Sequence, residues 1–240
     1  LWKENQMKRT LLPLSRPPIE AVVFDFDGTL AELHIDFGEM RSAVCRLMEQ
    51  YDVVPRIFDH LYILEMIEAA GVQIKEHSPE KGATFFDDAL RLIEGMEIEA
   101  AGKSNLFDGV REMLVTLTKR RISIGIITRN CFRALQVMFP DYRDYVDALI
   151  TREMTRFVKP DPRHLTEILS MLAAPAERTL MVGDHPIDIQ IGKEVGTYTA
   201  AVLTGTGKRP DLQKSSPDFL LSRVVEVGRI IELTNHRIPD

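Results

Sequence analysis

The stretch AVVFDFDGTL, residues 21–30, decides the fold of this chain. It opens with an apolar run, and Asp25 and Asp27 follow with only Phe26 between them. A continuous apolar run is typical of a strand covered on both faces, as in a parallel sheet. Because side chains alternate along a strand, the two acids share one face and Phe26 points into the core. Two like charges at the end of a buried strand repel, so one of them takes up a proton unless a cation compensates their charge.

Further apolar runs repeat this pattern along the chain, at 122–127, 148–150, 179–182 and 199–203. The segments between them have apolar residues three or four apart, which is the spacing of an amphipathic helix: 109–120, 131–139, 162–173 and 187–195. Strands that alternate with helices predict right-handed crossovers. We therefore expect an α/β fold, a doubly wound (Rossmann-like) parallel sheet, with a closing strand, turn and helix over 217–233.

The strand pattern stops between Leu30 and Phe107. An insertion of this length is too long for a plain loop, so it predicts a small helical domain. Its helical segments are 36–50, 55–70 and 79–101, separated by Pro55, Gly71 and 78–82. The expected domains are an N-terminal extension (1–18), a Rossmann-like catalytic core (19–30 plus 106–240) and an inserted helical cap (31–105).

The composition is that of an ordinary globular protein with a formal net charge of -6. This charge argues against a broad nucleic-acid or anionic-membrane surface, which needs clustered Lys and Arg. Cys45 and Cys131 lie far apart and form neither a disulfide framework nor a zinc motif, which favours a reducing compartment. No apolar stretch approaches the length of a membrane span. These features predict a cytoplasmic protein.

The chemistry collects where the predicted strands end, because ligands of open α/β sheets bind at the carboxyl ends of the strands. Thr128 follows the run 122–127, and Asp184 follows the run 179–182. Lys159 opens the crossover that follows the third predicted strand, 148–150. Carboxylates gathered there suit a hard cation such as Mg2+. Mg2+ also binds an oxygen of a substrate phosphate. One carboxylate is then able to attack the phosphorus of that phosphate, while another carries the proton to the leaving oxygen and later takes one from water.

Four motifs in this order resemble those of the haloacid dehalogenase superfamily of phosphohydrolases: DFDGTL (25–30), IITRN (126–130), VKPDP (158–162) and GDHPID (183–188). The helical insertion directly after the first motif resembles the cap-bearing, phosphoglycolate phosphatase-like branch. The resemblance implies a Mg2+-dependent phosphatase that hydrolyses a small phosphorylated metabolite through an aspartyl-phosphate. The expected partner is a small-molecule phosphate ester, and the expected assembly is a monomer or homodimer.

The resemblance also implies a role for each residue that handles the phosphoryl group. Asp25 would be the nucleophile, and Asp27 would be the general acid and base. The Thr128 hydroxyl and the backbone amide of Arg129 would bind a phosphoryl oxygen. Lys159 would stabilise the charge on the nucleophile and on the phosphate.

The metal site follows from the same resemblance. Asp184 would hold Mg2+ together with the Asp25 carboxylate and the Asp27 backbone carbonyl. Asp188 would support that shell or pair with Lys159. The supporting residues are Gly28, which gives the backbone room to turn, Thr29, which would orient Asp27, and Gly183, which precedes Asp184.

Two departures from the family pattern concern substrate preference. His185 stands where relatives often carry a small hydroxyl residue, and Arg129 separates Thr128 from Asn130. The segment TGTGK (204–208) matches no nucleotide-binding pattern and is interpreted as a strand-to-helix turn. Two alternatives stay open: a phosphosugar mutase on the same fold, and a catalytically idle interaction protein. The sequence does not define the substrate.

Overall fold

The structure is a computed structural model that describes residues 17–235. Residues 1–16 and 236–240 lie outside the described residues, and with them most of the predicted extension 1–18. The chain divides into two compact units. One takes the chain up to Leu33 together with the part from Ser104 onward, and the other is His34–Lys103. Each unit is described by itself.

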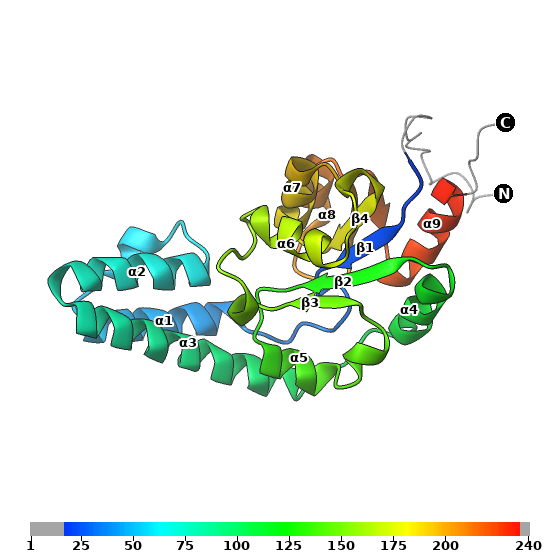
Figure 1. The fold of residues 1–240 in the computed structure, drawn as a ribbon. Helices are drawn as coiled ribbons and strands as arrows, with labels where there is room; N and C mark the ends of the chain where they lie inside the picture. The colour runs from blue at the N-terminus through cyan, green and yellow to red at the C-terminus, as the bar shows by residue number, and fades with distance from the viewer. Residues whose placement is uncertain (1–16, 236–240) are drawn as a thin grey trace. The chain divides into compact units, whose positions relative to one another are not determined.

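A parallel sheet forms the centre of the first unit (Figure 1). Within residues 17–235 it has six strands in the order β3-β2-β1-β4-β5-β6. The strands are β1 (Ala21–Phe24), β2 (Ser123–Ile127), β3 (Ala148–Ile150), β4 (Thr179–Gly183), β5 (Tyr198–Val202) and β6 (Phe219–Leu221). This is the order of a doubly wound sheet: β2 and β3 are added on one side of β1, and β4, β5 and β6 on the other. The predicted α/β, Rossmann-like fold is confirmed.

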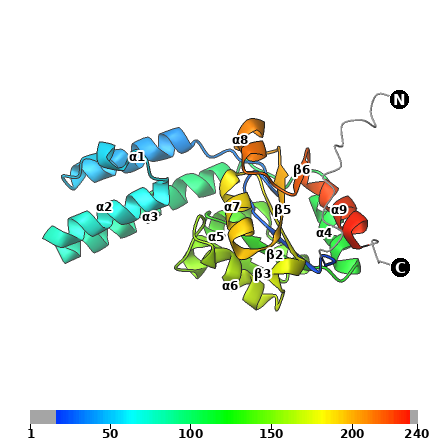
Figure 2. The same ribbon diagram turned by 90° about the horizontal axis from the view of Figure 1, so that it is seen from above.

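Helices cover both faces of the sheet (Figures 1 and 2). One face carries α4 (Val110–Lys119), α5 (Phe132–Met138) and α9 (Val227–Asn235), and the other carries α6 (Arg163–Met171), α7 (Pro186–Val195) and α8 (Arg209–Lys214). Short 3-10 turns are η2 (Tyr142–Asp144), η3 (Arg152–Met154), η4 (Ala176–Arg178) and η5 (Val224–Glu226). An apolar cluster lies between the sheet and the helices α6 and α7, and it includes Val23, Ile168 and Met181. Both sheet faces are therefore buried, as the uninterrupted apolar runs predicted.

The His34–Lys103 unit consists of α1 (Phe37–Gln50), η1 (Pro55–Phe58), α2 (Ile63–His77) and α3 (Pro79–Ala101). Its core is apolar and includes Met48, Met66 and Phe85. The expectation that Gly71 separates two segments was wrong, because α2 continues through this residue. Gly71 is buried close to Phe85 of α3, and this packing outweighs the cost of about 1 kcal/mol that glycine adds inside a helix. Among the helices of residues 17–235, none is both long and apolar enough to cross a membrane.

Candidate active site

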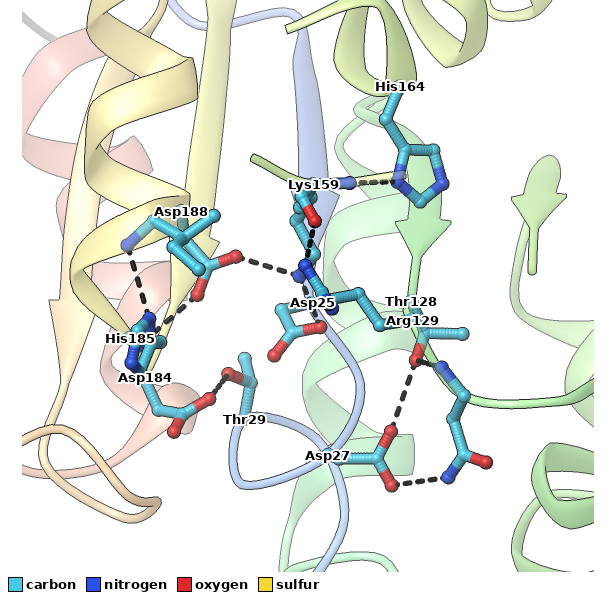
Figure 3. Close-up of polar contacts among 12 residues, drawn as sticks. Asp25, Asp27, Thr29, Thr128, Arg129, Lys159, His164, Asp184, His185 and Asp188 are labelled. Carbon is cyan, nitrogen blue, oxygen red and sulfur yellow. Dashed lines mark hydrogen bonds and ion pairs between the residues drawn. The ribbon is translucent and has the colours of Figure 1, made fainter. Parts of the chain in front are cut away.

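The carboxyl ends of β1, β2 and β4 bring the predicted site residues together (Figure 3). Asp25 follows β1, and its backbone N–H donates to the Val182 carbonyl at 2.8 Å, which continues the pairing with β4. Thr128 follows β2, and Asp184 follows β4. Lys159 reaches the same point from the crossover between β3 and α6. Parallel pairing thus gathers side chains that are far apart in the sequence.

Lys159 lies between two carboxylates. Its Nζ donates to Asp25 Oδ1 at 2.6 Å and to Asp188 Oδ1 at 2.7 Å. Its side chain is only 4% exposed. Burial disfavours the charged ammonium, but the attraction of Asp188 and Asp25 outweighs burial and raises the pKa of Lys159. The amine therefore stays protonated, and it fixes the Asp25 carboxyl group through one oxygen.

Three buried carboxyl groups form an acidic cluster beside this amine. Asp25, Asp184 and Asp188 each offer an oxygen, and these oxygens all lie within 4.8 Å of one another. Burial raises the pKa of Asp184 and of Asp188, and in each case the charge of a neighbouring Asp adds to the rise. Three carboxylates and one ammonium leave two uncompensated negative charges when all are ionised. Oxygen donors with this charge fit a divalent cation.

Asp184 is held in place by hydroxyl and amide donors. The Thr29 hydroxyl donates to its Oδ1 at 3.2 Å. The Thr206 backbone N–H and hydroxyl donate to its Oδ2 at 2.8 and 3.3 Å. Sequence reasoning expected Thr29 to orient Asp27, whereas the hydrogen bond of its hydroxyl in the structure goes to Asp184. The loop after β5 therefore supports the acidic cluster from the neighbouring strand end.

Asp27 lies apart from that cluster and faces the turn after β2 (Figure 3). Thr128 Oγ1 donates to its Oδ2 at 3.1 Å, and Asn130 Nδ2 donates to its Oδ1 at 2.8 Å. Burial raises the pKa of Asp27 to about 6, and the nearby Asp25 adds to the rise. Burial likewise raises the pKa of Asp25 to about 6, against the opposing effect of Lys159. A carboxyl group with a pKa near 6 suits proton transfer near neutral pH.

Two glycines, Gly28 and Gly183, allow the backbone around the site to adopt its path. Gly28 has a φ of +79°, a conformation that residues with a side chain rarely adopt. At Gly183 a Cβ atom would lie 2.2 Å from the Asp188 side chain, so any larger residue would displace that carboxylate. The backbone conformation at Gly28 and the lack of space beside Gly183 thus both favour glycine.

The Lys159 backbone is held on both sides. The Arg129 guanidinium donates to the Lys159 carbonyl oxygen, and the Lys159 N–H donates to His164 Nδ1 at 3.2 Å. This contact leaves His164 Nε2 to donate to the Ile150 carbonyl, 3.4 Å away. Burial, followed by the charge of Lys159, lowers the pKa of His164 to about 3, so the ring is neutral.

His185, the departure from the family pattern, caps α7. Its Nδ1 accepts from the Ile187 N–H at 3.3 Å, and its own N–H donates to Asp188 Oδ2 at 3.1 Å. The imidazole therefore takes over the capping contact that a small hydroxyl side chain makes at a helix N-terminus. The same arrangement directs the other oxygen of Asp188 to Lys159.

Sequence reasoning did not assign roles to Asn130, His164 and Thr206. Asn130 and Thr206 each follow the carboxyl end of a strand that borders the site, β2 and β5 respectively. Their positions at strand ends indicate that they lie near the site, whereas the sequence of 204–208 predicts only a turn. The hydrogen bond of Thr206 with Asp184 joins residues 22 apart in sequence, so the turn pattern alone does not predict it. His164 lies on a helix and carried no comparable signal.

Comparison with known proteins identifies the family of this chain. A family model described as haloacid dehalogenase-like hydrolase matches residues 22–202. A haloacid dehalogenase-like hydrolase domain-containing protein from Arabidopsis thaliana is 30% identical over 223 residues, which cover 89% of this chain and 84% of that protein. The chain therefore belongs to the haloacid dehalogenase-like hydrolase family, and the expected family is confirmed, as is the expected class of enzyme, a phosphatase.

Other relatives bear the names of phosphatases. Pyrophosphatase PpaX from Bacillus cereus is 28% identical and covers 90% of this chain and 98% of that protein. N-acetylmuramic acid 6-phosphate phosphatase from Pseudomonas putida is also 28% identical, covering 89% and 96%. Among solved structures, a haloacid dehalogenase-like hydrolase from Bacteroides fragilis has a TM-score of 0.65 at 22% identity and covers 87% of this chain and 99% of that chain. At this identity the structural likeness shows the shared fold.

Proposed function

We propose that this enzyme is a Mg2+-dependent phosphatase that hydrolyses a small phosphorylated metabolite through an aspartyl-phosphate at Asp25. One observation carries the proposal. The buried Lys159 ammonium bonds Asp25 at 2.6 Å and Asp188 at 2.7 Å, inside a cluster in which Asp184 supplies a third carboxylate. Such a cluster lowers the stability of the fold, because buried like charges repel and lose their hydration, and this cost is typical of a functional site.

The proposed reaction has two steps carried by residues of this chain. An oxygen of Asp25 attacks the phosphorus, and the bond from phosphorus to the leaving oxygen breaks while Asp27 gives that oxygen a proton. Water then attacks the phosphorus of the aspartyl-phosphate while Asp27 takes a proton from the water. The bond from phosphorus to the Asp25 oxygen breaks, the Asp25 carboxylate is restored and inorganic phosphate leaves. The Lys159 ammonium and the Thr128 hydroxyl stabilise the charge on the transferring group, since phosphoryl transfer depends mainly on positioning and electrostatics.

Asp25 and Asp184 are the carboxylates that would hold Mg2+, with the Asp27 backbone carbonyl as the third protein ligand and Asp188 in support. The three carboxyl groups of the acidic cluster fit this cation because they supply oxygen donors and an uncompensated charge. Bound Mg2+ would neutralise phosphate charge and the repulsion among the carboxylates. Asp188 holds Lys159 at the same time, so this residue links the metal site to the amine.

The substrate class follows from the relatives and from the domain organisation. The relatives act, by name, on pyrophosphate and on N-acetylmuramic acid 6-phosphate, and phosphoglycolate is the substrate that the resemblance suggests. We assign the helical domain, 31–105, the role of a cap that selects the substrate, because it is inserted directly after the first motif. We propose that the enzyme acts in the cytoplasm, as a monomer or a homodimer.

The test is phosphate release from p-nitrophenyl phosphate, phosphoglycolate, pyrophosphate and N-acetylmuramic acid 6-phosphate, with Mg2+ and with EDTA. We expect turnover of at least one ester with Mg2+, none with EDTA, and none for Asp25→Asn. Chromatography of the products separates hydrolysis from a mutase reaction, which returns the phosphoryl group to the substrate. Turnover that persists in Asp25→Asn would contradict the proposed nucleophile.

A further inference from the structure

Asn130 is buried in the turn after β2, directly beside Asp27. Its side chain donates from Nδ2 to Asp27 Oδ1 at 2.8 Å, and only 4% of the residue is exposed. The residue contributes neither to the acidic cluster nor to the Lys159 contacts. Its side-chain NH2 group therefore serves Asp27, the residue proposed as general acid and base.

The orientation of the Asn130 amide is fixed by the backbone. Its Oδ1 accepts from the Cys131 N–H at 2.7 Å. Because one end of the amide is thereby committed as an acceptor, the end that faces Asp27 must be the NH2 donor. Asn130 is therefore a fixed donor to Asp27 Oδ1.

The Thr128 hydroxyl is the second donor to Asp27, but it is not fixed in the same way. Thr128 Oγ1 accepts from the Asn130 N–H at 2.9 Å and gives its single proton to Asp27 Oδ2 at 3.1 Å. A hydroxyl has only one proton to donate. When Thr128 donates to a phosphoryl oxygen, as proposed above, its hydrogen bond to Asp27 Oδ2 must end.

We propose that Asn130 is the positioning residue of the general acid: it holds Asp27 through Oδ1 while the Thr128 hydroxyl turns to the phosphoryl group and releases Oδ2. This inference rests on the proposed phosphatase function. Asp27 Oδ2 then carries the proton that passes to the leaving oxygen as the bond to phosphorus breaks and its electron pair moves onto that oxygen. Phosphate recognition and proton delivery are thus linked through one hydroxyl group, and Asn130 keeps Asp27 in place during the exchange.

Asn130→Asp tests the fixed donor with the smallest change. The variant keeps the size of the side chain and an oxygen for the Cys131 N–H, but it replaces the NH2 donor to Asp27 with an acceptor. The matched control is Asn235→Asp in α9, because the Asn235 amide bonds the Ile19 backbone at 2.8 Å near the opposite ends of the strands. Asn130→Ala serves as a second variant that adds no charge.

The readout is the single-turnover phosphorylation rate with two esters of similar shape, p-nitrophenyl phosphate and phenyl phosphate. The p-nitrophenolate ion leaves without a proton, whereas the more basic phenolate needs one. A general acid contributes about 10²- to 10⁴-fold, so we expect both Asn130 variants to lose about 30-fold with phenyl phosphate and less than about 3-fold with p-nitrophenyl phosphate. Asn235→Asp should keep the wild-type ratio of the two rates.

The results separate the inference from the function on which it rests. A retained burst with p-nitrophenyl phosphate shows that the variant is folded, so a selective loss with phenyl phosphate supports the positioning role. Equal losses with both esters in both Asn130 variants would overturn the inference while the phosphatase function stands. A wild type that hydrolyses neither these esters nor the metabolite panel would overturn the proposed function and the inference with it.

Discussion

The two compact units of this chain differ in what they bury. The unit that contains the sheet buries Asp25, Lys159, Asp184 and Asp188 side by side. The unit His34–Lys103, all of which the structure describes, has an apolar core, and Glu97 is its one charged residue among those classed as buried. Buried charges cost stability, whereas apolar contacts supply it. Their concentration in one unit therefore distinguishes the unit that we propose performs the chemistry from the unit whose interior is almost entirely apolar.

The largest difference should appear when a cation is removed from each unit. Lys159→Gln leaves Asp25 and Asp188 without their shared partner. We expect kcat/KM to fall at least about 10³-fold and unfolding to become easier by about 3 kcal/mol. Arg46→Gln in α1 removes an exposed ion pair with Glu39 and should change neither quantity. Phosphate release measures kcat/KM, and urea unfolding measures the change in stability. Equal changes in Lys159→Gln and Arg46→Gln would contradict the difference between the two units.

A core truncation in the helical unit tests whether its packing is separate from that of the sheet. Phe85 is fully buried and contacts Tyr51 edge to face, with ring centroids 5.3 Å apart. Phe85→Ala should destabilise this unit by about 3–5 kcal/mol. Hydrogen exchange should then accelerate within 34–103 and stay unchanged in β1 and β4, whose amides report on the other unit. Equal acceleration in both places would mean that the units unfold together.

The buried His164 should make the stability of the sheet unit depend on pH. Its pKa is lowered to about 3 from 6.5, first by burial and then by Lys159. The unfolded state therefore binds more protons in this window, so the stabilisation is complete above pH 6.5 and is lost as the pH falls towards 3. The loss at pH 5 is about 2 kcal/mol.

Because the amide does not titrate, His164→Asn should gain about 2 kcal/mol of unfolding free energy relative to the wild type between pH 6.5 and 5. Asp25 and Asp27, whose pKa is raised to about 6, titrate in the same window but do so in both proteins, so the comparison isolates His164. His77→Asn, at an exposed position near the end of α2, is the control and should keep the wild-type profile. A wild-type slope retained by His164→Asn would assign the pH dependence to other groups.

The smallest expected effect concerns the repulsion within the acidic cluster. Asp184→Asn removes one of three adjacent carboxylates, so the metal-free protein should become about 1 kcal/mol more stable. The same variant should lose the rise in melting temperature that Mg2+ gives the wild type. Asp36→Asn, at the N-cap of α1, is the control, because Asn caps a helix as well as Asp does. Full Mg2+ stabilisation of Asp184→Asn would contradict its place in the metal site.

The local features of the sheet could be predicted from the sequence. Uninterrupted apolar runs defined the strands, and the residue after each run identified Asp25, Thr128 and Asp184, because strand ends of a parallel sheet meet at one edge. The hydrogen bond of Asn130 with Asp27 could not be predicted, because the position of Asn130 after β2 brings it to this edge of the sheet but does not fix where its amide points. The path of α2 through Gly71 depends on tertiary packing against α3, which overrides local propensity.

The most direct test of the central claim is the capture of the phosphoryl group on Asp25. In Asp27→Asn, p-nitrophenyl phosphate should still phosphorylate the enzyme, while hydrolysis of the intermediate slows because its general base is absent. Acid quenching and peptide mass spectrometry should then find one phosphoryl group, located on Asp25, in reactions with Mg2+ and none in reactions with EDTA. A phosphoryl group on another residue, or release of p-nitrophenolate with no phosphorylated enzyme at any time, would contradict the account.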